Sequence, residues 1–112
     1  MGDRRQIHFK DMGIWYYTHW NGYCLLEDLQ NAIDSAKDRW CDDSYCFRII
    51  LTSLFKKYEN TTIGAGILNE KMDTQYDLNP IVFIKTNQVE YNGETYSFEE
   101  FCELDIEMLG NR

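Results

Sequence analysis

The sequence has little histidine or proline and no long apolar run. His8 and His19 are its only histidines, and Pro80 is its only proline. No stretch approaches the roughly 18 uncharged apolar residues that a transmembrane helix needs, and no apolar run follows residues 1–5 as it would in a secretory signal. These absences predict a cytoplasmic protein without a membrane segment.

Motifs of the common catalytic and cofactor sites are also missing. There is no Walker loop, Gly-x-Ser-x-Gly elbow or His-Glu-x-x-His helix. The Gly-Ala-Gly segment at 64–66 is shorter than a dinucleotide fingerprint and precedes a predicted strand, so no helix N-terminus stands ready for a phosphate. We expect no metal and no cofactor, and an enzyme that uses His19 is the minor alternative.

The four cysteines form no Cys-x-x-Cys pair of the kind that structural zinc or thioredoxin-like chemistry uses. They are Cys24, Cys41, Cys46 and Cys102. Each has an apolar neighbour, which is typical of reduced thiols in a core. We therefore expect free, buried cysteines.

Length and composition predict one folded domain over residues 1–112. A chain of 112 residues is long enough for one hydrophobic core and too short for two. Hydrophobic residues make up 44% of the chain and aromatic residues 15%, which excludes an intrinsically disordered protein. The aromatic residues could also close a homo-oligomer, and the sequence leaves the oligomeric state open.

Apolar periodicity and turn residues predict an α+β fold with the element order ββααββββα. The expected elements are strands over 6–10 and 14–20, helices over 23–40 and 42–58, strands over 61–68, 81–84, 89–91 and 94–96, and a helix from 98. We expect an antiparallel or mixed sheet with two or three helices packed on one face.

Three local signals support this assignment. Asn92-Gly93 between two apolar runs is typical of a hairpin turn. Asp42 or Asp43 can cap the second helix. The sequence from Ser97 to Glu100 has the pattern of a capping box.

Charge is distributed unevenly along the chain. The net charge is -8, and residues 59–112 hold eleven acidic and three basic residues, whereas residues 1–58 hold eight of each. Such a field repels phosphate backbones and attracts basic surfaces. We expect no direct binding to nucleic acid, and the alternative role of the charge is solubility.

The first candidate ligand-binding segment is formed by His19, Trp20 and Asn21. It brings a titratable ring, an indole donor and an amide to the end of a predicted strand, where binding groups are common. In the structural alternative, Asn21-Gly22 makes a turn and Trp20 packs in the core.

Arg39, Trp40 and Arg48 complete the candidate ligand site. An arginine within an apolar helix must reach water or pair with an acid, so Arg48 is expected near an acceptor. The candidate acids are Asp28, Asp34 and Asp43. The alternative is a nucleotide site, in which Trp20 or Trp40 stacks on a base and Arg39 or Arg48 meets a phosphate.

Acidic residues recur at helical spacing along the predicted last helix. Glu99 and Glu100 are explained by the positive end of the helix dipole. Glu103 and Glu107 remain as a candidate docking surface for a protein with a basic surface, although such a stripe is usually a solvated face.

Several segments resemble small proteins encoded by phages and mobile elements. The likeness is carried by Met1-Gly2-Asp3-Arg4-Arg5, Tyr17-Thr18-His19-Trp20-Asn21-Gly22, Arg39-Trp40, the strand 61–67 and the terminal 97–101. Those proteins often begin Met-Gly-Asn-Arg, whereas this chain has Asp3, and they carry a Tyr-x-His-Trp-x-Gly segment before a helix. The resemblance implies an origin and carries over no catalytic residue.

The first functional hypothesis is a non-enzymatic phage or mobile-element accessory protein that binds a host protein, such as a component of a defence system. The alternative is a protein that binds or sequesters a small ligand such as a nucleotide.

Overall fold

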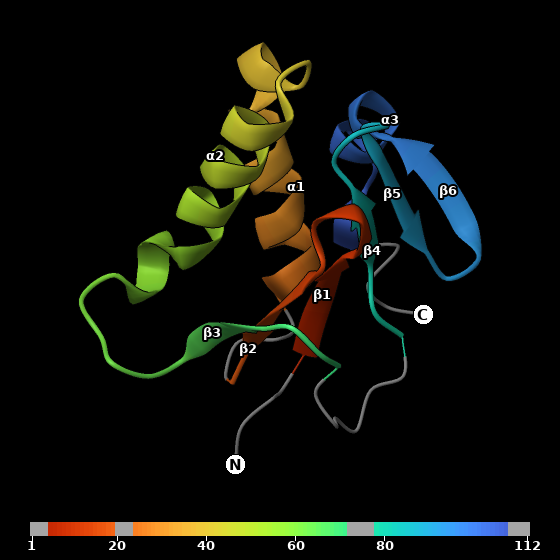
Figure 1. Cartoon of the computed structure of the whole chain (residues 1–112). Coiled ribbons are helices and arrows are strands. Elements are labelled where there is room, and N and C mark those ends of the chain that lie inside the picture. The colour runs from red at the N-terminus through yellow and green to blue at the C-terminus, as the bar shows by residue number, and fades with distance from the viewer. Residues whose placement is uncertain (1–4, 20–23, 72–77, 108–112) are drawn as a thin grey trace.

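The protein folds as one mixed six-stranded sheet with three helices (Figure 1). The computed structural model describes residues 5–19, 24–71 and 78–107. The strands are β1 (Arg5–Phe9), β2 (Ile14–Thr18), β3 (Ala65–Leu68), β4 (Ile81–Phe83), β5 (Gln88–Tyr91) and β6 (Glu94–Ser97), and the helices are α1 (Leu25–Ser35), α2 (Asp43–Phe55) and α3 (Phe98–Glu103). The predicted α+β class and the order ββααββββα are confirmed.

The sheet order is β3-β2-β1-β4-β5-β6, so β3 and β6 are the two edges. All neighbours are antiparallel except β1 and β4, which run parallel with His8 opposite Ile81 and Phe9 opposite Val82. The pairs β1–β2, β4–β5 and β5–β6 are joined by short connections, whereas β2–β3 and the central parallel pair β1–β4 join segments far apart in the chain. The sheet is therefore mixed.

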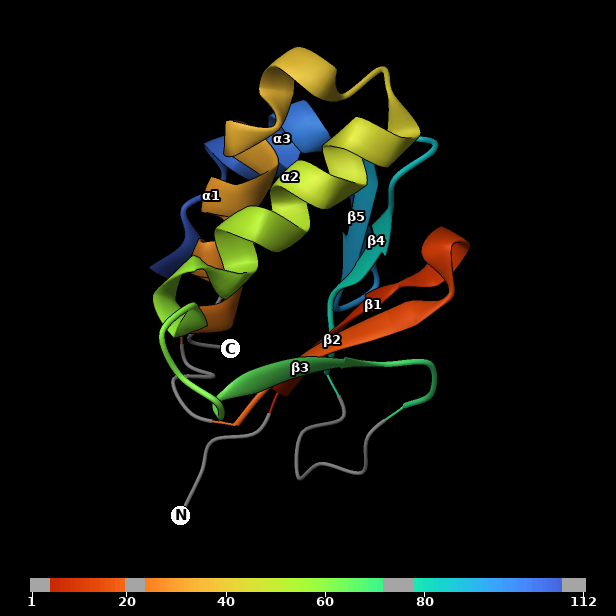
Figure 2. The ribbon, with the colours of Figure 1, turned by 60° about the vertical axis from the view of Figure 1, so that its left-hand side comes forward.

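The three helices lie on one face of the sheet (Figure 2). Alternate residues of β1 place Ile7 and Phe9 beneath them, both with no exposed surface, because side chains of a strand alternate between faces. Helix α1 lies between α2 and α3, and α3 contacts β5 and β6. Helix α2 therefore covers the sheet toward its β3 edge.

Helix α1 ends earlier than the predicted Trp40. Its apolar stripe is buried as expected, but the α-helix stops at Ser35 and a 3₁₀ turn follows over Lys37–Arg39. The indole nitrogen of Trp40 folds back and donates to the carbonyl of Ile33 at 2.9 Å. This bond satisfies one of the carbonyls left open at a helix C-terminus.

The local turn and cap predictions are confirmed. Asn92 and Gly93 have φ of 53° and 82° between β5 and β6, which is the left-handed geometry that a tight hairpin requires. The Asp42 carboxylate accepts from the backbone nitrogen of Tyr45 at 3.3 Å and begins α2. Ser97 and Glu100 form the reciprocal capping box, with bonds of 3.0 and 2.8 Å.

The prediction of buried thiols is right for one cysteine and wrong for another. All four cysteines are free, but only Cys46 is buried. Cys41 is exposed because it lies in the turn between the two long helices, where apolar neighbours do not imply burial. Cys24 and Cys102 are half-buried.

Candidate functional site

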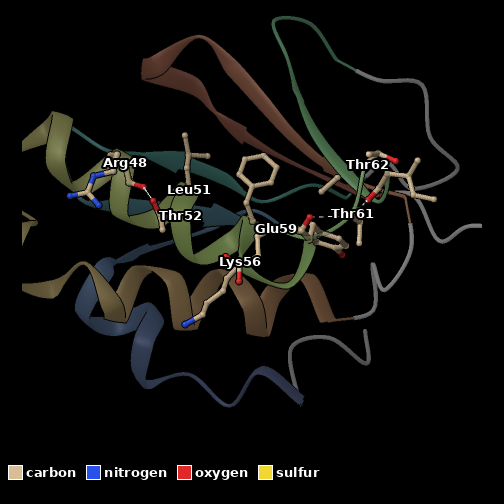
Figure 3. Close-up of a pocket in the computed structure, with 11 residues that line it drawn as sticks. Arg48, Leu51, Thr52, Lys56, Glu59, Thr61 and Thr62 are labelled. Carbon is tan, nitrogen blue, oxygen red and sulfur yellow. Dashed lines mark hydrogen bonds between the residues drawn. The ribbon is translucent and has the colours of Figure 1, made fainter.

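A groove of about 580 Å³ lies between α2 and the segment that leads into β3 (Figure 3). We call it the α2–β3 groove. Leu51 and Phe55 of α2 form one wall, and Ile63 and Ala65 form the other. Figure 3 shows Leu51 pointing from α2 toward the strands.

The groove exists because α2 has two apolar ridges and the core uses only one of them fully. The first ridge is buried and consists of Cys46, Ile50 and Leu54. The neighbouring ridge consists of Phe47, Leu51 and Phe55, which also follow each other at intervals of four residues. These side chains are only half-buried. Phe55 contacts the Tyr16 ring edge-on at 5.0 Å and leaves its other side to the groove. An unfilled apolar ridge of this kind is a surface on which another apolar group can pack.

The β3 side of the groove exposes large apolar side chains. Ile63 is 60% exposed, Ile67 is 44% exposed and Leu68 is 37% exposed. Ile67 pairs with the core residue Tyr16 and so lies on the helix-covered face of the sheet, beyond the reach of α2. The sequence from Thr61 to Asn69 carries no charged residue, although charged residues are the usual protection of an edge strand.

A smaller hollow of about 350 Å³ adjoins the groove and shares Ile63 and Ala65 with it. His19 and Tyr17 line it, and the backbone nitrogen of His19 donates to the Gly64 carbonyl at 2.7 Å. Of the first candidate segment, His19 thus lies beside the groove, while Trp20 and Asn21 lie outside the described residues.

Two glycines allow aromatic rings to lie against this segment. A Cβ on Gly64 would be 2.7 Å from the Tyr58 ring, and one on Gly66 would be 2.5 Å from the Tyr17 hydroxyl. Gly64 also has φ of +111°, which only glycine adopts readily. Aromatic side chains therefore make the close approach that glycines in a strand often mark.

Arg48 and Lys56 line the groove on the solvent side of α2. Figure 3 shows both extending away from the strands. The predicted ion pair of Arg48 is not formed with any described carboxylate; Asp28 instead binds Lys57, with 2.7 Å between nitrogen and oxygen. Burial lowers the pKa of Lys57, but the hydrogen bond to Asp28 and the negative charge of Asp28 together outweigh this, so the pKa is raised.

Arg39 and Trp40 lie at the opposite end of the helix pair from His19. The Arg39 guanidinium lies over the exposed Tyr45 ring at 5.4 Å, and Trp40 packs edge-on against Phe98 at 5.5 Å. Because α2 has 13 residues and each residue rises 1.5 Å, its two ends are about 20 Å apart. The structure therefore separates Arg39 and Trp40 from His19, and Arg48 lies between them along α2.

The predicted acidic stripe is interrupted. Glu103 is the last residue of α3, and the backbone becomes extended at Leu104, so Glu107 does not continue the same helix face. The side-chain nitrogen of Gln30 stabilises this end by donating to the carbonyls of Phe101 and Leu104 at 3.0 and 2.9 Å. Glu103 and Glu107 are both exposed.

The Cys46 and Cys102 thiols are not activated as nucleophiles. Burial raises the pKa of the Cys46 and Cys102 thiols to about 11. His8 stacks on Trp15 at 3.9 Å, and burial with the nearby Lys10 charge lowers its pKa. Within residues 5–19, 24–71 and 78–107, no three His, Cys, Asp or Glu side chains gather as a metal site would need, and no helix is long and apolar enough to cross a membrane.

Comparisons with protein families, curated proteins and solved structures all end without a match. The resemblance to phage and mobile-element proteins stays a prediction.

The groove was missed by the sequence analysis, although two signals pointed to it. The apolar residues of the second helix cover more than one narrow face, and the segment 61–68 combines glycines with exposed apolar residues. Neither signal shows that the two elements are adjacent, because their contact depends on the tertiary fold.

Proposed function

We propose that this chain is a non-enzymatic binding protein that docks on another protein through the α2–β3 groove and the exposed apolar residues of β3. The observation that carries the proposal is the apolar lining of the groove by Leu51, Phe55 and Ile63, with further exposed apolar side chains on β3 at Ile67 and Leu68. Contiguous apolar surface of this kind marks interaction sites more often than isolated apolar residues do. In biological terms, we propose an accessory protein of a phage or mobile element. It would act in the cytoplasm on a host protein such as a component of a defence system.

The chemistry near the groove favours binding over catalysis. The groove wall consists mainly of apolar groups, and its hydroxyls come from Thr52, Tyr58, Thr61 and Thr62. Two of these hydroxyls donate to nearby backbone carbonyls, Thr52 to Arg48 at 2.8 Å and Thr61 to Ile63 at 2.6 Å. Polar groups committed to the chain's own backbone are poorly placed to act on a substrate.

The same geometry argues against the nucleotide alternative. A phosphate is favoured at a helix N-terminus, whereas the groove lies along the C-terminal half of α2, where the helix dipole is negative. Trp40 donates a hydrogen bond to Ile33, packs against Phe98 and lies far from the groove. The nucleotide-binding role of Arg39, Trp40 and Arg48 stays a prediction with less structural support than protein binding.

Site-specific photo-crosslinking in the cell of origin tests the proposal. A photoreactive residue at Ile63 is expected to crosslink a partner protein, while one at Asn92, in the exposed turn between β5 and β6, is not. Equal crosslinking from both positions, or none from Ile63 in folded protein, contradicts the proposal.

Charge reversal at Glu103 and Glu107 separates the groove from the acidic docking surface predicted from the sequence. The double variant Glu103→Lys, Glu107→Lys should leave crosslinking from Ile63 unchanged, because both residues lie in and beyond α3, the helix at the β6 end of the sheet. Loss of crosslinking in this variant would show that the partner docks on the acidic residues.

A further inference from the structure

The charge of α2 suggests what kind of partner segment enters the groove. From Ser44 to Tyr58 the chain carries Arg48, Lys56 and Lys57 and no acidic residue, although the whole protein has a net charge of -8. Lys57 is paired with Asp28, whereas Arg48 and Lys56 are exposed and form no ion pair with a described carboxylate. Arg48 and Lys56 thus make the α2 side of the groove positive, and Glu59 is the single acidic residue among the described residues that line it.

Arg48 and Lys56 lie on one ridge that runs along α2 into the 3₁₀ turn after it. Arg48, Thr52 and Lys56 follow each other at intervals of four residues, directly beside the apolar ridge of Phe47, Leu51 and Phe55. Because a helix rises 1.5 Å per residue, the Cα atoms of Arg48 and Lys56 are about 12 Å apart. Two positive groups at that spacing match acids seven or eight residues apart on a second helix.

The apolar part of the groove also suits a helix. The half-buried ridge of α2 forms one wall of the groove, and the side chains of Ile63 and Ala65 form the other. The helices of the protein likewise pack against a neighbouring helix on one side and against the sheet on another. Helices on a sheet lie about 10 Å from their neighbours, so a helix in the groove would continue the helical layer α3-α1-α2 across the β3 edge (Figure 2).

A β-strand is the less suitable occupant. Strand addition would use the free edge of β3, but β3 has only four residues, and short edge strands pair poorly with added strands. It would also leave the apolar ridge of α2 unfilled.

We propose that the α2–β3 groove binds an amphipathic helix of a partner protein, with apolar residues seated against Leu51, Phe55 and Ile63 and acidic residues along the flank that meets Arg48 and Lys56. The proposal rests on the protein-binding function above and specifies its partner. The long side chains of Arg48 and Lys56 can turn their charged ends toward the bound flank while their stems extend the apolar surface.

Fluorescence anisotropy with designed helical peptides tests the inference. One peptide of about 20 residues, long enough to form an isolated helix, carries a leucine stripe flanked by glutamates. A second has lysines in place of the glutamates, and a third has the first composition in scrambled order. The full-length protein should bind the glutamate peptide about tenfold more tightly than the lysine peptide, since two ion pairs replace two repulsions, and it should bind the scrambled peptide least.

Matched charge variants locate the effect. The double variant Arg48→Glu, Lys56→Glu should reverse the preference between the glutamate and lysine peptides. The control Lys37→Glu, Lys85→Glu changes the net charge equally at two exposed positions away from the groove and should keep the parent preference. Equal behaviour of the two double variants overturns the charge assignment.

Other outcomes identify other occupants. A dimer in native mass spectrometry that Ile63→Asp abolishes would make a second copy of this chain the occupant. A nucleotide that raises the melting temperature of the parent but not of Arg48→Glu would make the groove a ligand site. Failure of every peptide, with crosslinking from Ile63 retained, would overturn the helix inference while leaving the protein-binding function in place.

Discussion

The indole nitrogen of Trp40 donates to the carbonyl oxygen of Ile33 at 2.9 Å, seven residues back along the chain. This contact closes the C-terminus of α1 and turns the chain toward α2. It also explains why Trp40, which from sequence alone was a candidate for stacking on a base, has a structural role in the described fold.

The variant Trp40→Phe should lower the free energy of unfolding by about 1 kcal/mol, because it removes the donor and retains an aromatic ring near Phe98. Trp40→Ala should cost more, since the edge-on ring contact is also lost. Urea unfolding followed by circular dichroism measures both. Equal stability of Trp40→Phe and the parent would show that the hydrogen bond contributes nothing.

Thr18 offers a stabilising substitution. Its side chain is 2% exposed, and its hydroxyl oxygen has no hydrogen-bond partner among the described residues. Thr18→Val keeps the branched shape and replaces the hydroxyl with a methyl group, so it should raise the free energy of unfolding by about 1 kcal/mol. The control Thr18→Ser keeps the hydroxyl, removes the methyl and should be destabilising. A destabilised Thr18→Val protein would reveal a partner for the hydroxyl.

Asp11 links the first hairpin to the end of β4. Its two carboxylate oxygens accept from the backbone nitrogens of Ile84 and Lys85 at 3.0 and 2.8 Å. Asp11→Ala should lower the free energy of unfolding by about 2 kcal/mol, because two charge-assisted bonds are lost. Asp38→Ala, at an exposed position in the 3₁₀ turn after α1, is the matched control and should change stability by less than about 0.5 kcal/mol.

His8 should make stability depend on pH. Burial against Trp15 and the charge of Lys10 lower its pKa below the ordinary value of 6.5. The unfolded chain therefore binds the proton more readily, and the free energy of unfolding should fall as pH decreases through about 6.5. Above that pH His8 is neutral in both states and adds no pH dependence.

The non-titrating variant His8→Gln isolates this effect from that of the carboxylates. Chemical unfolding between pH 8 and pH 5, on the order of the window in which histidine titrates, should show a smaller acid loss for His8→Gln than for the parent. Parallel pH profiles of the two proteins would mean that the His8 pKa is the same in the folded and unfolded states.

Local features of the fold could be predicted from the sequence, and features set by distant contacts could not. The Asn92-Gly93 turn and the Ser97–Glu100 capping box depend on residues within one turn of each other, so their residue types decide them. The end of α1 was placed five residues too late because Trp40 continues the apolar stripe, and only the fold shows that its indole returns to Ile33.

The candidate site was harder to predict for the same reason. Arg48 was expected to pair with an acid such as Asp28, but Asp28 binds Lys57, which comes closer in the packed helices. Leu51 and Ile63 meet across the groove only because β3 pairs with β2 at the sheet edge that α2 overlies. No local pattern encodes that proximity.

The parallel pairing of β1 with β4 has a consequence for synthesis of the chain. His8 and Ile81 are neighbours across these strands, so the centre of the sheet closes a loop of more than seventy residues. A ribosome adds about 5–20 residues each second, so the β1 edge of the first hairpin stays unpaired for seconds until β4 has been synthesised. During that interval the nascent chain is open to aggregation and to chaperones, and the loop-closure entropy of the central pair makes folding after release slower than that of the local hairpins.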